Sequence, residues 1–394
     1  MKTTGLFAGI GGIEYGLHSS GISTHLLCEI MPEALCVLKA RFEDAKTATD
    51  VTQLKSIGNV DILCGGFPCQ DISIAGSKVG LNGEKSSLVK EMFRLIESCK
   101  KTKPKYVLIE NVANIISLNK GEALKLITDE MHRLGYNWAY RLIDPRSLGI
   151  PQRRPRFIFL ASNVVHPKHI LFPDYEDLSS SIDDKLKEVS DDVSAYGFYW
   201  TEGKIGIGWA KDSIPPLKCG STLGLPSSPA IWDINNDFFG TPSIEDAERL
   251  QGFPSNWTQP IEDGGFKANN RWKLVGNAVN TKVSSWIGER IQNFPNYQID
   301  PKRIKVSKCK PWAKAGFNDG DIVMEVVSTP YPEGINYIPI LDFLEHPLQP
   351  LSLKATLGFR KRVLDSTLIK YPERFIDSIN TYLFNQYGYV DREN

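Results

Sequence analysis

The stretch KTTGLFAGIGGIEYGLH, residues 2–18, decides the fold of this chain. It joins an apolar run, Thr3–Phe7, to a segment with helical spacing, Ile13–His18, through a glycine-rich turn at residues 9–12. Glycines let the backbone of such a turn approach a ligand, and the helix after it offers N–H groups at its N-terminus. A strand, a glycine turn and a helix in this order predict the first unit of an α/β nucleotide-binding sheet.

The same alternation of strand and helix continues over about the first 160 residues. Apolar runs predict strands, and helical spacing between them predicts helices, one of which is opened by Pro32. The predicted strands are Thr3–Phe7, His25–Glu29, Val60–Cys64, Tyr106–Glu110, Trp138–Ile143 and Phe157–Leu160, and the predicted helices are Ile13–His18, Glu33–Arg41, Leu88–Lys100 and Glu122–Leu134. This alternation favours a parallel sheet with helices on both faces.

The composition changes after about Ala161. Residues 174–192 are acidic and rich in serine, and Tyr199–Trp232 is rich in Gly, Pro, Ser and Trp without clear periodicity. We expect a second, irregular domain in this region.

Helical signals return in the last third of the chain. Ser243–Gly252 has Ser243 as its expected N-cap, and Thr281–Ile291 has helical spacing. From about residue 294 the chain carries further regularly spaced apolar residues, which predict that this last segment folds onto the rest.

Length and composition are those of a globular protein with two or three domains. The chain has 394 residues, of which 41% are hydrophobic and 23% are charged. No apolar run approaches the roughly 20 residues that cross a bilayer, and the N-terminus has no secretory pattern, so we expect a cytoplasmic protein. The formal net charge is zero, but binding to nucleic acid needs a basic face rather than a basic total.

Cys69 differs from the other six of the seven cysteines by its setting. None of the seven forms a C-x-x-C pair or a zinc-finger array, and a buried structural thiol is the ordinary reading of each. Cys69 follows the buried strand Val60–Cys64 in the segment GGFPCQ, residues 65–70. The carboxyl ends of strands are where open α/β sheets bind ligands, so Cys69 is the candidate nucleophile.

A carboxylate and several arginines are expected at the same edge of the sheet. Glu110 ends a predicted strand, where it suits an acid–base or hydrogen-bonding role. Arg153, Arg154 and Arg156 lie in the segment QRRPR that enters the strand Phe157–Leu160, and they suit bidentate contacts to a carboxylate, a base carbonyl or a phosphate. Read alone, Glu110 also fits a helix N-cap or a surface charge, and the arginines also fit a solvated basic run.

Two further acidic residues suit a nucleotide cofactor. Glu29 ends the second strand, at the position that holds ribose hydroxyls in nucleotide-binding sheets, and Asp50 is placed to accept from an adenine amino group. The strict G-x-G-x-x-G pattern fails because Glu14 occupies its last glycine position. This favours an adenosine-containing cofactor other than that of a dehydrogenase, although the turn alone also fits a structural role.

Six segments, in this order, together resemble the cytosine-5 DNA methyltransferase family. They are FAGIGG (7–12), GGFPCQ (65–70), ENV (110–112), QRRPR (152–156), RLQGFP (249–254) and VGNAV (275–279). The match runs from Thr4 to about Ile291, roughly three quarters of the chain. The resemblance implies a Rossmann-like S-adenosylmethionine-dependent methyltransferase sheet with a smaller, irregular target-recognition domain. It implies transfer of a methyl group from S-adenosylmethionine to C5 of cytosine in a specific double-stranded DNA sequence, as in bacterial restriction-modification systems.

The resemblance also implies a role for each matching residue. Cys69, which follows Pro68, would add as thiolate to C6 of a cytosine flipped out of the helix. Glu110 would bind N3 and the exocyclic amine, Arg156 would hold the base carbonyl and orient Glu110, and Arg154 would support the loop. The mechanism requires no metal. The residues implied around the cofactor are Phe7, Ala8, Gly9, Ile10, Gly11, Gly12, Glu29, Ile30, Asp50, Val51, Leu88, Asn277 and Ala278, and those implied to contact DNA are Gln70, Ser73, Lys85 and Arg249.

The family's architecture implies three parts of the chain. Residues 1–160 with 273–293 would form the catalytic and cofactor-binding domain, and residues 161–272 the target-recognition domain. Residues 294–394 are a C-terminal extension without a counterpart in the family's core. Base readout comes from loop side chains in the major groove, for which Lys218, Ser221, Thr222 and Trp232 are candidates. The implied partner is double-stranded DNA, with no membrane; we expect a monomer that works beside a restriction endonuclease.

Two positions depart from the family pattern. Gly5 stands where an acidic or small polar residue is usual, and Lys85 stands where arginine is usual. Because lysine cannot make a bidentate contact, closure of the loop around Lys85 could differ.

Three alternatives remain open. One family branch methylates tRNA, but the Cys-Phe-Thr tripeptide that marks it is absent from the sequence. An inactive DNA-binding paralogue would be expected to lose Cys69 or Glu110, and both are present. A nicotinamide-dependent oxidoreductase would account for the glycine turn but not for the other five segments.

Overall fold

The computed structural model describes most of the chain, in two compact units. The described residues are 1–68, 88–172, 193–203, 206–220, 228–294, 299, 301–307, 311–369, 371–372 and 374–390. Unit 1 comprises Met1–Leu148, Pro155–Ile182 and Val279–Ile335, and unit 2 comprises Gly149–Arg154, Asp183–Ala278 and Asn336–Asn394. None of the helices in the described ranges is long and apolar enough to cross a membrane.

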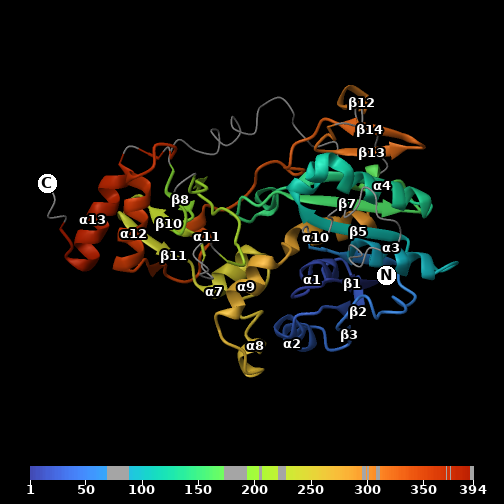
Figure 1. The fold of residues 1–394 in the computed structure, drawn as a ribbon, viewed down its shortest axis with the longest axis horizontal. Coiled ribbons are helices and arrows are strands. Elements are labelled where there is room, and N and C mark those ends of the chain that lie inside the picture. Colours follow the sequence, from blue (N-terminus) through green and yellow to red (C-terminus); the bar gives the residue numbers. More distant parts are fainter. Residues whose placement is uncertain are drawn as a thin grey trace, which may run out of the picture. The chain divides into compact units, whose positions relative to one another are not determined.

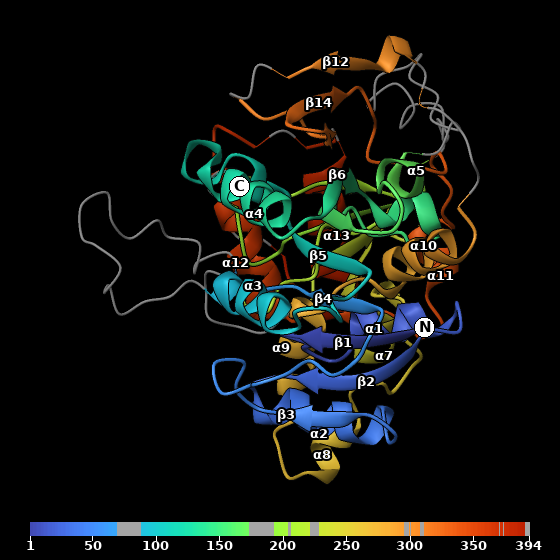
Figure 2. The same ribbon diagram turned by 90° about the vertical axis from the view of Figure 1, so that its right-hand side faces the viewer.

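Unit 1 is built on one sheet, in which ten strands lie among the described residues. Their order is β12-β14-β13-β6-β7-β5-β4-β1-β2-β3, and Figure 2 shows them one above another from β3 to β12. The strands are β1 (Lys2–Leu6), β2 (Ser23–Cys28), β3 (Lys46–Ala48), β4 (Ile62–Gly65), β5 (Tyr106–Val112), β6 (Asn137–Ile143), β7 (Arg156–Ser162), β12 (Ile304–Val306), β13 (Gly316–Asp319) and β14 (Ile322–Val326).

The directions of these strands correct one expectation. The five strands from β1 to β5 run parallel, but β7 lies between β5 and β6 and is antiparallel to both. The expected all-parallel sheet is therefore wrong at β7, because apolar runs predict that a strand forms but not its direction or its neighbours. As a consequence Arg156, the first residue of β7, lies opposite Val112 at the carboxyl end of β5.

Helices cover both faces of this sheet, as the sequence predicts. Alternate residues of β4 and β5 point to opposite faces: Leu63 and Val107 pack in one buried cluster, and Cys64 and Leu108 in another. The first cluster also holds residues of α3 (Leu88–Ser98) and α4 (Glu122–Arg133), and the second holds residues of α1 (Gly12–His18), α5 (Lys168–Leu171) and α10 (Thr281–Gln292). The helix α2 (Pro32–Arg41) connects β2 to β3, and short 3₁₀ turns occupy Ala113–Ile116, Leu118–Gly121, Pro145–Leu148 and Pro301–Arg303.

Unit 2 contains a smaller antiparallel sheet and a set of helices of four to thirteen residues (Figure 1). Its described strands follow the order β15-β11-β10-β8-β9. They are β8 (Ala195–Phe198), β9 (Ala210–Lys211), β10 (Ala230–Asp233), β11 (Phe238–Thr241) and β15 (Gln349–Pro350). The helices are α7 (Ile244–Leu250), α8 (Pro260–Asp263), α9 (Asn270–Asn277), α11 (Ile340–Phe343), α12 (Leu353–Leu364) and α13 (Phe375–Tyr387). Ser243 caps α7 by accepting from the Asp246 N–H at 3.0 Å, as its sequence predicts.

The segment after residue 294 is divided between the two units. Residues up to Ile335 add β12, β13 and β14 to the large sheet, whereas Asn336–Asn394 belong to unit 2. There Phe359 of α12 and Phe375 of α13 are buried against Phe198, Trp232 and Phe239 of the small sheet. The last hundred residues thus pack into both compact units, as their apolar spacing predicts, and the bounds of these units differ from those of the three parts expected from the sequence.

Candidate active site

The glycine turn after β1 begins the carboxyl edge of the large sheet. Gly11 has φ +82°, a left-handed conformation that suits glycine, and a Cβ there would lie 2.3 Å from the Phe42 ring. A Cβ on Gly12 would lie 2.4 Å from the carbonyl oxygen of Val279. Around Gly9, by contrast, a Cβ would meet nothing within 4 Å. The turn is therefore packed tightly underneath and open at Gly9, which leaves room for a ligand against its backbone.

Glu29 connects this turn to the end of β2. Its carboxylate accepts from the N–H of Gly9 at 2.8 Å and from the N–H of Met31 at 2.9 Å. The side chain is buried to 7% exposure. Glu29 therefore fixes the open part of the turn, and its carboxylate lies beside the space over Gly9.

Glu110 and Arg156 form an ion pair at the same edge. Nε of Arg156 lies 3.1 Å from Oε1 of Glu110, and the two side chains are 14% and 11% exposed. A Cβ on Gly66 would lie 3.2 Å from Oε2 of Glu110, so the carboxylate packs against the backbone that follows β4. A largely buried pair of this kind holds the carboxylate in one orientation.

Asn111 links the Glu110 strand to the segment that leads to Cys69. Its Nδ2 donates to the carbonyl of Phe67 at 3.0 Å, and its Oδ1 accepts from the N–H of Val112. Asn111 is buried and fixes the backbone two residues before Cys69. Cys69 itself, with Gln70, Ser73 and Lys85, lies outside the described residues. The sequence marks Asn111 only as part of the string ENV, because a contact to a backbone carbonyl leaves no pattern in the sequence.

Arg154 takes part in a buried network within unit 2. Its guanidinium donates to the carbonyls of Leu217 at 2.7 Å, Gly276 at 3.0 Å and Ala278 at 3.1 Å. Gln152, which is fully buried, donates to the carbonyl of Leu250 at 2.8 Å and accepts from the N–H of Leu217.

Gln251 completes this network by donating to the carbonyl of Val275 at 2.8 Å. Three of the segments noted in the sequence, at 152–156, 249–254 and 275–279, are therefore joined by side-chain contacts to backbone carbonyls. Gln152 and Gln251 are structural residues that the sequence does not reveal as such, because a buried amide has no distinctive spacing.

The comparisons with known proteins identify the family. The family model of C-5 cytosine-specific DNA methylases matches residues 1–205. A Type II methyltransferase, M2.BsuMI from Bacillus subtilis (strain 168), is 43% identical over 382 residues, which cover 96% of this chain and 97% of that protein. The chain belongs to the C-5 cytosine-specific DNA methylase family. The family prediction and the enzyme class, a DNA (cytosine-5-)-methyltransferase, are thereby confirmed.

Other relatives cover less of the chain. M1.ScrFI from Lactococcus lactis subsp. cremoris is 28% identical over 74% of this chain and 77% of its own length. The crystal structure of S. pombe Dnmt2 methyltransferase superposes with a TM-score of 0.52 at 19% identity, covering 74% of this chain and 99% of that one. At this identity the structure shows the fold alone, and it confirms the Rossmann-like methyltransferase class.

The cofactor of this methyltransferase is S-adenosylmethionine, as for the family. The residues at the carboxyl edge fit such a molecule. The turn is open over Gly9, a helix of seven residues starts at Gly12, and the Glu29 carboxylate lies beside the opening. Val51 is buried and Leu88 opens α3. Asp50 accepts from the N–H and the hydroxyl of Thr52.

The remaining predicted cofactor residues have varied surroundings. Ile30 is 71% exposed at the end of β2, so its side chain is available to a ligand. Ile10 is buried, whereas Phe7 is partly exposed in a left-handed conformation with φ 55°. Asn277 and Ala278 end α9 in unit 2, and their contact with the cofactor stays a prediction.

Two predicted DNA-contacting side chains are engaged inside unit 2. Arg249 donates to Asp246 at 2.7 Å and to the carbonyl of Phe343 at 2.8 Å, and it pairs with Glu345 at 3.0 Å. These contacts give Arg249 a structural position. Trp232 is 1% exposed in the aromatic core, so the suggestion that it reads bases is wrong.

Glu14 occupies the space that a side chain at position 5 would fill. A Cβ on Gly5 would lie 1.8 Å from Oε1 of Glu14, and the thiol of Cys64 donates to the same oxygen at 3.4 Å. Glu14 is 1% exposed, and burial raises its pKa to about 7. The Glu14 carboxyl from α1 thus occupies the space that an acidic side chain at position 5 would fill. This is also why Glu14 stands where the G-x-G-x-x-G pattern has its last glycine.

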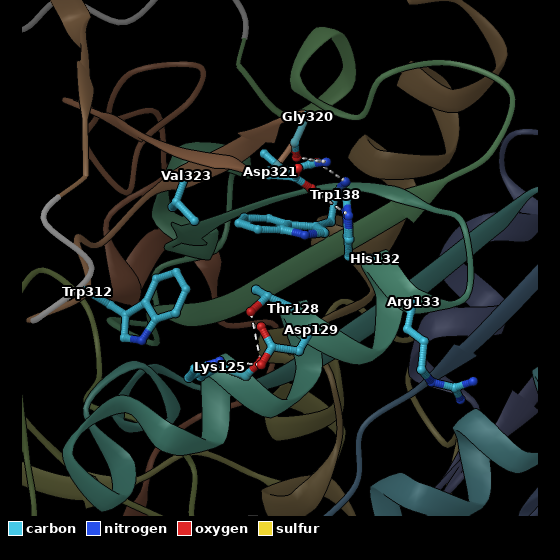
Figure 3. A pocket seen from close by; sticks show the side chains of 11 residues that line it. Lys125, Thr128, Asp129, His132, Arg133, Trp138, Trp312, Gly320, Asp321 and Val323 are labelled. Carbon is cyan, nitrogen blue, oxygen red and sulfur yellow. Dashed lines mark hydrogen bonds and ion pairs between the residues drawn. The ribbon is translucent and has the colours of Figure 1, made fainter.

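A pocket of about 440 Å³ lies at the opposite, amino end of the strands. Figure 3 shows the indoles of Trp138 and Trp312 beside it, with Lys125, Asp129 and His132 of α4 at its border. Trp138 is the second residue of β6, and β6 runs parallel to β5. Through β7, Trp138 lies level with Val107 of β5, three residues before Glu110, so the pocket lies toward the amino end of the strands and Glu110 toward the carboxyl end.

Proposed function

We propose that this methyltransferase modifies a flipped-out cytosine within a specific double-stranded DNA sequence, through a covalent bond between Cys69 and C6 of the base. The observation that carries the proposal is the Glu110–Arg156 pair at the carboxyl edge, with Asn111 fixing the backbone that leads to Cys69. The proposal further assigns unit 2 to target recognition.

Each step follows from the chemistry of these side chains. The Cys69 thiolate attacks C6 and forms the S–C6 bond, while Glu110 stabilises a proton on N3 of the ring as charge moves onto it. Arg156, paired with Glu110 through Nε, donates to the cytosine carbonyl with an N–H group that neither Glu110 nor the Pro155 carbonyl takes, and it keeps the carboxylate facing N3. C5 becomes nucleophilic in this adduct.

S-adenosylmethionine supplies an electrophilic methyl group on a sulfonium centre. After C5 is methylated, a base removes the C5 proton and the S–C6 bond breaks, so the Cys69 thiolate leaves and aromatic 5-methylcytosine is released. The base must leave the helix first, because C6 cannot be attacked within the stack. The open backbone at Gly9 and the carboxylate of Glu29 would hold the methyl donor at the edge that carries Glu110.

The proposal is tested with purified full-length chain, labelled S-adenosylmethionine and mixed-sequence double-stranded DNA. We expect label on C5 of cytosine and, in bisulfite sequencing, one defined sequence around the modified base. Absence of transfer to DNA at every salt concentration, with transfer to tRNA instead, would contradict the proposed substrate.

We further propose that the enzyme protects DNA from a partner restriction endonuclease and acts as a monomer in the cytoplasm. For the endonuclease partner, support comes from the relatives, which are named Type II methyltransferases. DNA from cells that express the chain should resist cleavage by an endonuclease with the same recognition sequence. Equal cleavage of DNA from expressing and non-expressing cells would contradict this role.

A further inference from the structure

The helix α12 carries a basic run, Arg360-Lys361-Arg362, that the proposed function does not use. Within unit 2 Arg362 donates to the carbonyl of Trp200 at 2.7 Å and to the carbonyl of Glu202 at 3.3 Å. A Cβ on Gly203 would lie 2.9 Å from Cβ of Arg362, so the chain also packs on the stem of this side chain. Arg362 thereby fixes the backbone of the segment 200–203.

The segment around Lys218 is fixed independently. Arg154 donates to the carbonyl of Leu217, and the N–H of Leu217 donates to Gln152 at 3.0 Å. A Cβ on Gly276 would lie 2.3 Å from the carbonyl carbon of Lys218, which shows how closely the two backbones approach. Lys218 therefore projects from a backbone that is held on both sides.

These two segments bring Lys218 and Glu202 together. The Lys218 ammonium lies 3.6 Å from the centre of the Tyr199 ring and forms an ion pair with the Glu202 carboxylate. The side chains remain 40% and 26% exposed. An ion pair exposed to this degree contributes little to stability, so an incoming ligand can open it at small cost. A rigid backbone that presents polar side chains to solvent is what base readout requires.

We propose that Lys218 and Glu202 read one G·C base pair in the major groove, and that Arg362 positions Glu202. Lys218 would donate to O6 and N7 of guanine, and Glu202 would accept from the N4 amino group of the paired cytosine. An A·T pair offers the carboxylate an acceptor, O4 of thymine, and the reversed T·A pair offers the ammonium a methyl group in place of N7, so both are disfavoured. The inference rests on the proposed assignment of unit 2 to target recognition, and it gives the C-terminal segment a role in specificity.

The test is methylation of a randomised double-stranded DNA library by the full chain, read by bisulfite sequencing. We expect the target to contain a G·C pair whose preference falls about tenfold in both Lys218→Met and Glu202→Gln, at the same position. Arg362→Met should weaken the preference at that position, and Arg362→Lys, which keeps one donor group, should restore part of it. Arg360→Met is the matched control, because Arg360 lies on the same helix and contacts Asn380, and it should leave the preference unchanged.

Unchanged preferences in Lys218→Met and Glu202→Gln, or relaxation at two different positions, would overturn the inference. So would an Arg362→Met variant that is slower on every sequence to the same extent, since that result indicates a structural role alone. A wild-type chain that methylates no DNA would overturn the proposed function as well. If the wild-type chain has a defined target sequence and the variants keep the same base preference, this inference is overturned but the proposed function is not.

Discussion

Replacing Glu14 by glutamine should remove a distinct part of the pH dependence of stability. Glu14 is buried on α1, where its Oε1 accepts from the Cys64 thiol and its Oε2 has no hydrogen-bond partner. Burial raises its pKa from an ordinary value of 4.5 to about 7, and the nearby charge of Glu29 adds to the increase. Glutamine has nearly the same shape and does not titrate.

The magnitude follows from the difference between the two pKa values. Between pH 4.5 and about 7 the native state binds more protons at Glu14 than the unfolded state does, so the free energy of unfolding falls as pH rises through this interval. The loss amounts to about 3 kcal/mol and is complete above about pH 7. In Glu14→Gln this loss is absent, so the variant should gain about 3 kcal/mol relative to wild type between pH 4.5 and pH 8.

Urea denaturation of both proteins at pH 5, 6, 7 and 8 measures this difference. Both proteins contain the same other titratable groups, such as His166, whose pKa burial lowers to about 4. The contributions of these groups to the pH dependence cancel in the difference between the two proteins. Glu43→Gln, a change at an exposed side chain, is the matched control and should show no such gain. A difference between Glu14→Gln and wild type that stays constant with pH would refute the reasoning, even if the variant is less stable overall.

Two further substitutions test the site from its backbone contacts. Gly12→Ala places a Cβ 2.4 Å from the Val279 carbonyl oxygen, so we expect about 1–3 kcal/mol of destabilisation and weaker binding of S-adenosylmethionine by calorimetry. Gly206→Ala, which adds a Cβ in open space, should change neither. Asn111→Ala removes the contact to the Phe67 carbonyl, so turnover should fall about tenfold or more while cofactor affinity is retained. Asn114→Ala, at an exposed position, is its control, and equal turnover in the two variants would contradict a positioning role for Asn111.

The sequence predicts the elements of the large sheet well because each has a strong local signal. Glycine and proline bound the strands and helices, and apolar spacing distinguishes the two, so β1, α1, β4 and β5 lie within a few residues of their expected ranges. The antiparallel insertion of β7 has no local signal. It depends on which neighbour offers a free edge, which is settled only when the whole sheet forms.

The candidate site is predicted in part. Glu110 and Arg156, far apart in sequence, meet at the carboxyl edge as the family resemblance implies. Asn111 and Gln152 were missed because their contacts are to backbone carbonyls, which leave no pattern in the sequence. Trp232 was wrongly named as a base-reading candidate, because an aromatic residue in an irregular region gives the same sequence pattern whether it faces DNA or a hydrophobic core.

The C-terminal segment could not be placed from the sequence for a related reason. Its apolar spacing shows that it folds, but not against what. The structure divides it, with Trp312 donating to the Gly121 carbonyl in unit 1 and Phe375 packing on Trp209 in unit 2. Such pairings depend on tertiary contacts across more than 150 positions of sequence.

The most direct test of the central claim is trapping of the covalent intermediate. Double-stranded DNA in which 5-fluorocytosine replaces cytosine carries no proton at C5, so the final elimination is blocked and the enzyme stays attached to the base. Incubation with S-adenosylmethionine, denaturing electrophoresis and peptide mass spectrometry should show a DNA adduct at Cys69. The adduct should be absent in Cys69→Ser, which should still bind the cofactor. An adduct at another residue, or one that persists in Cys69→Ser, would contradict the account.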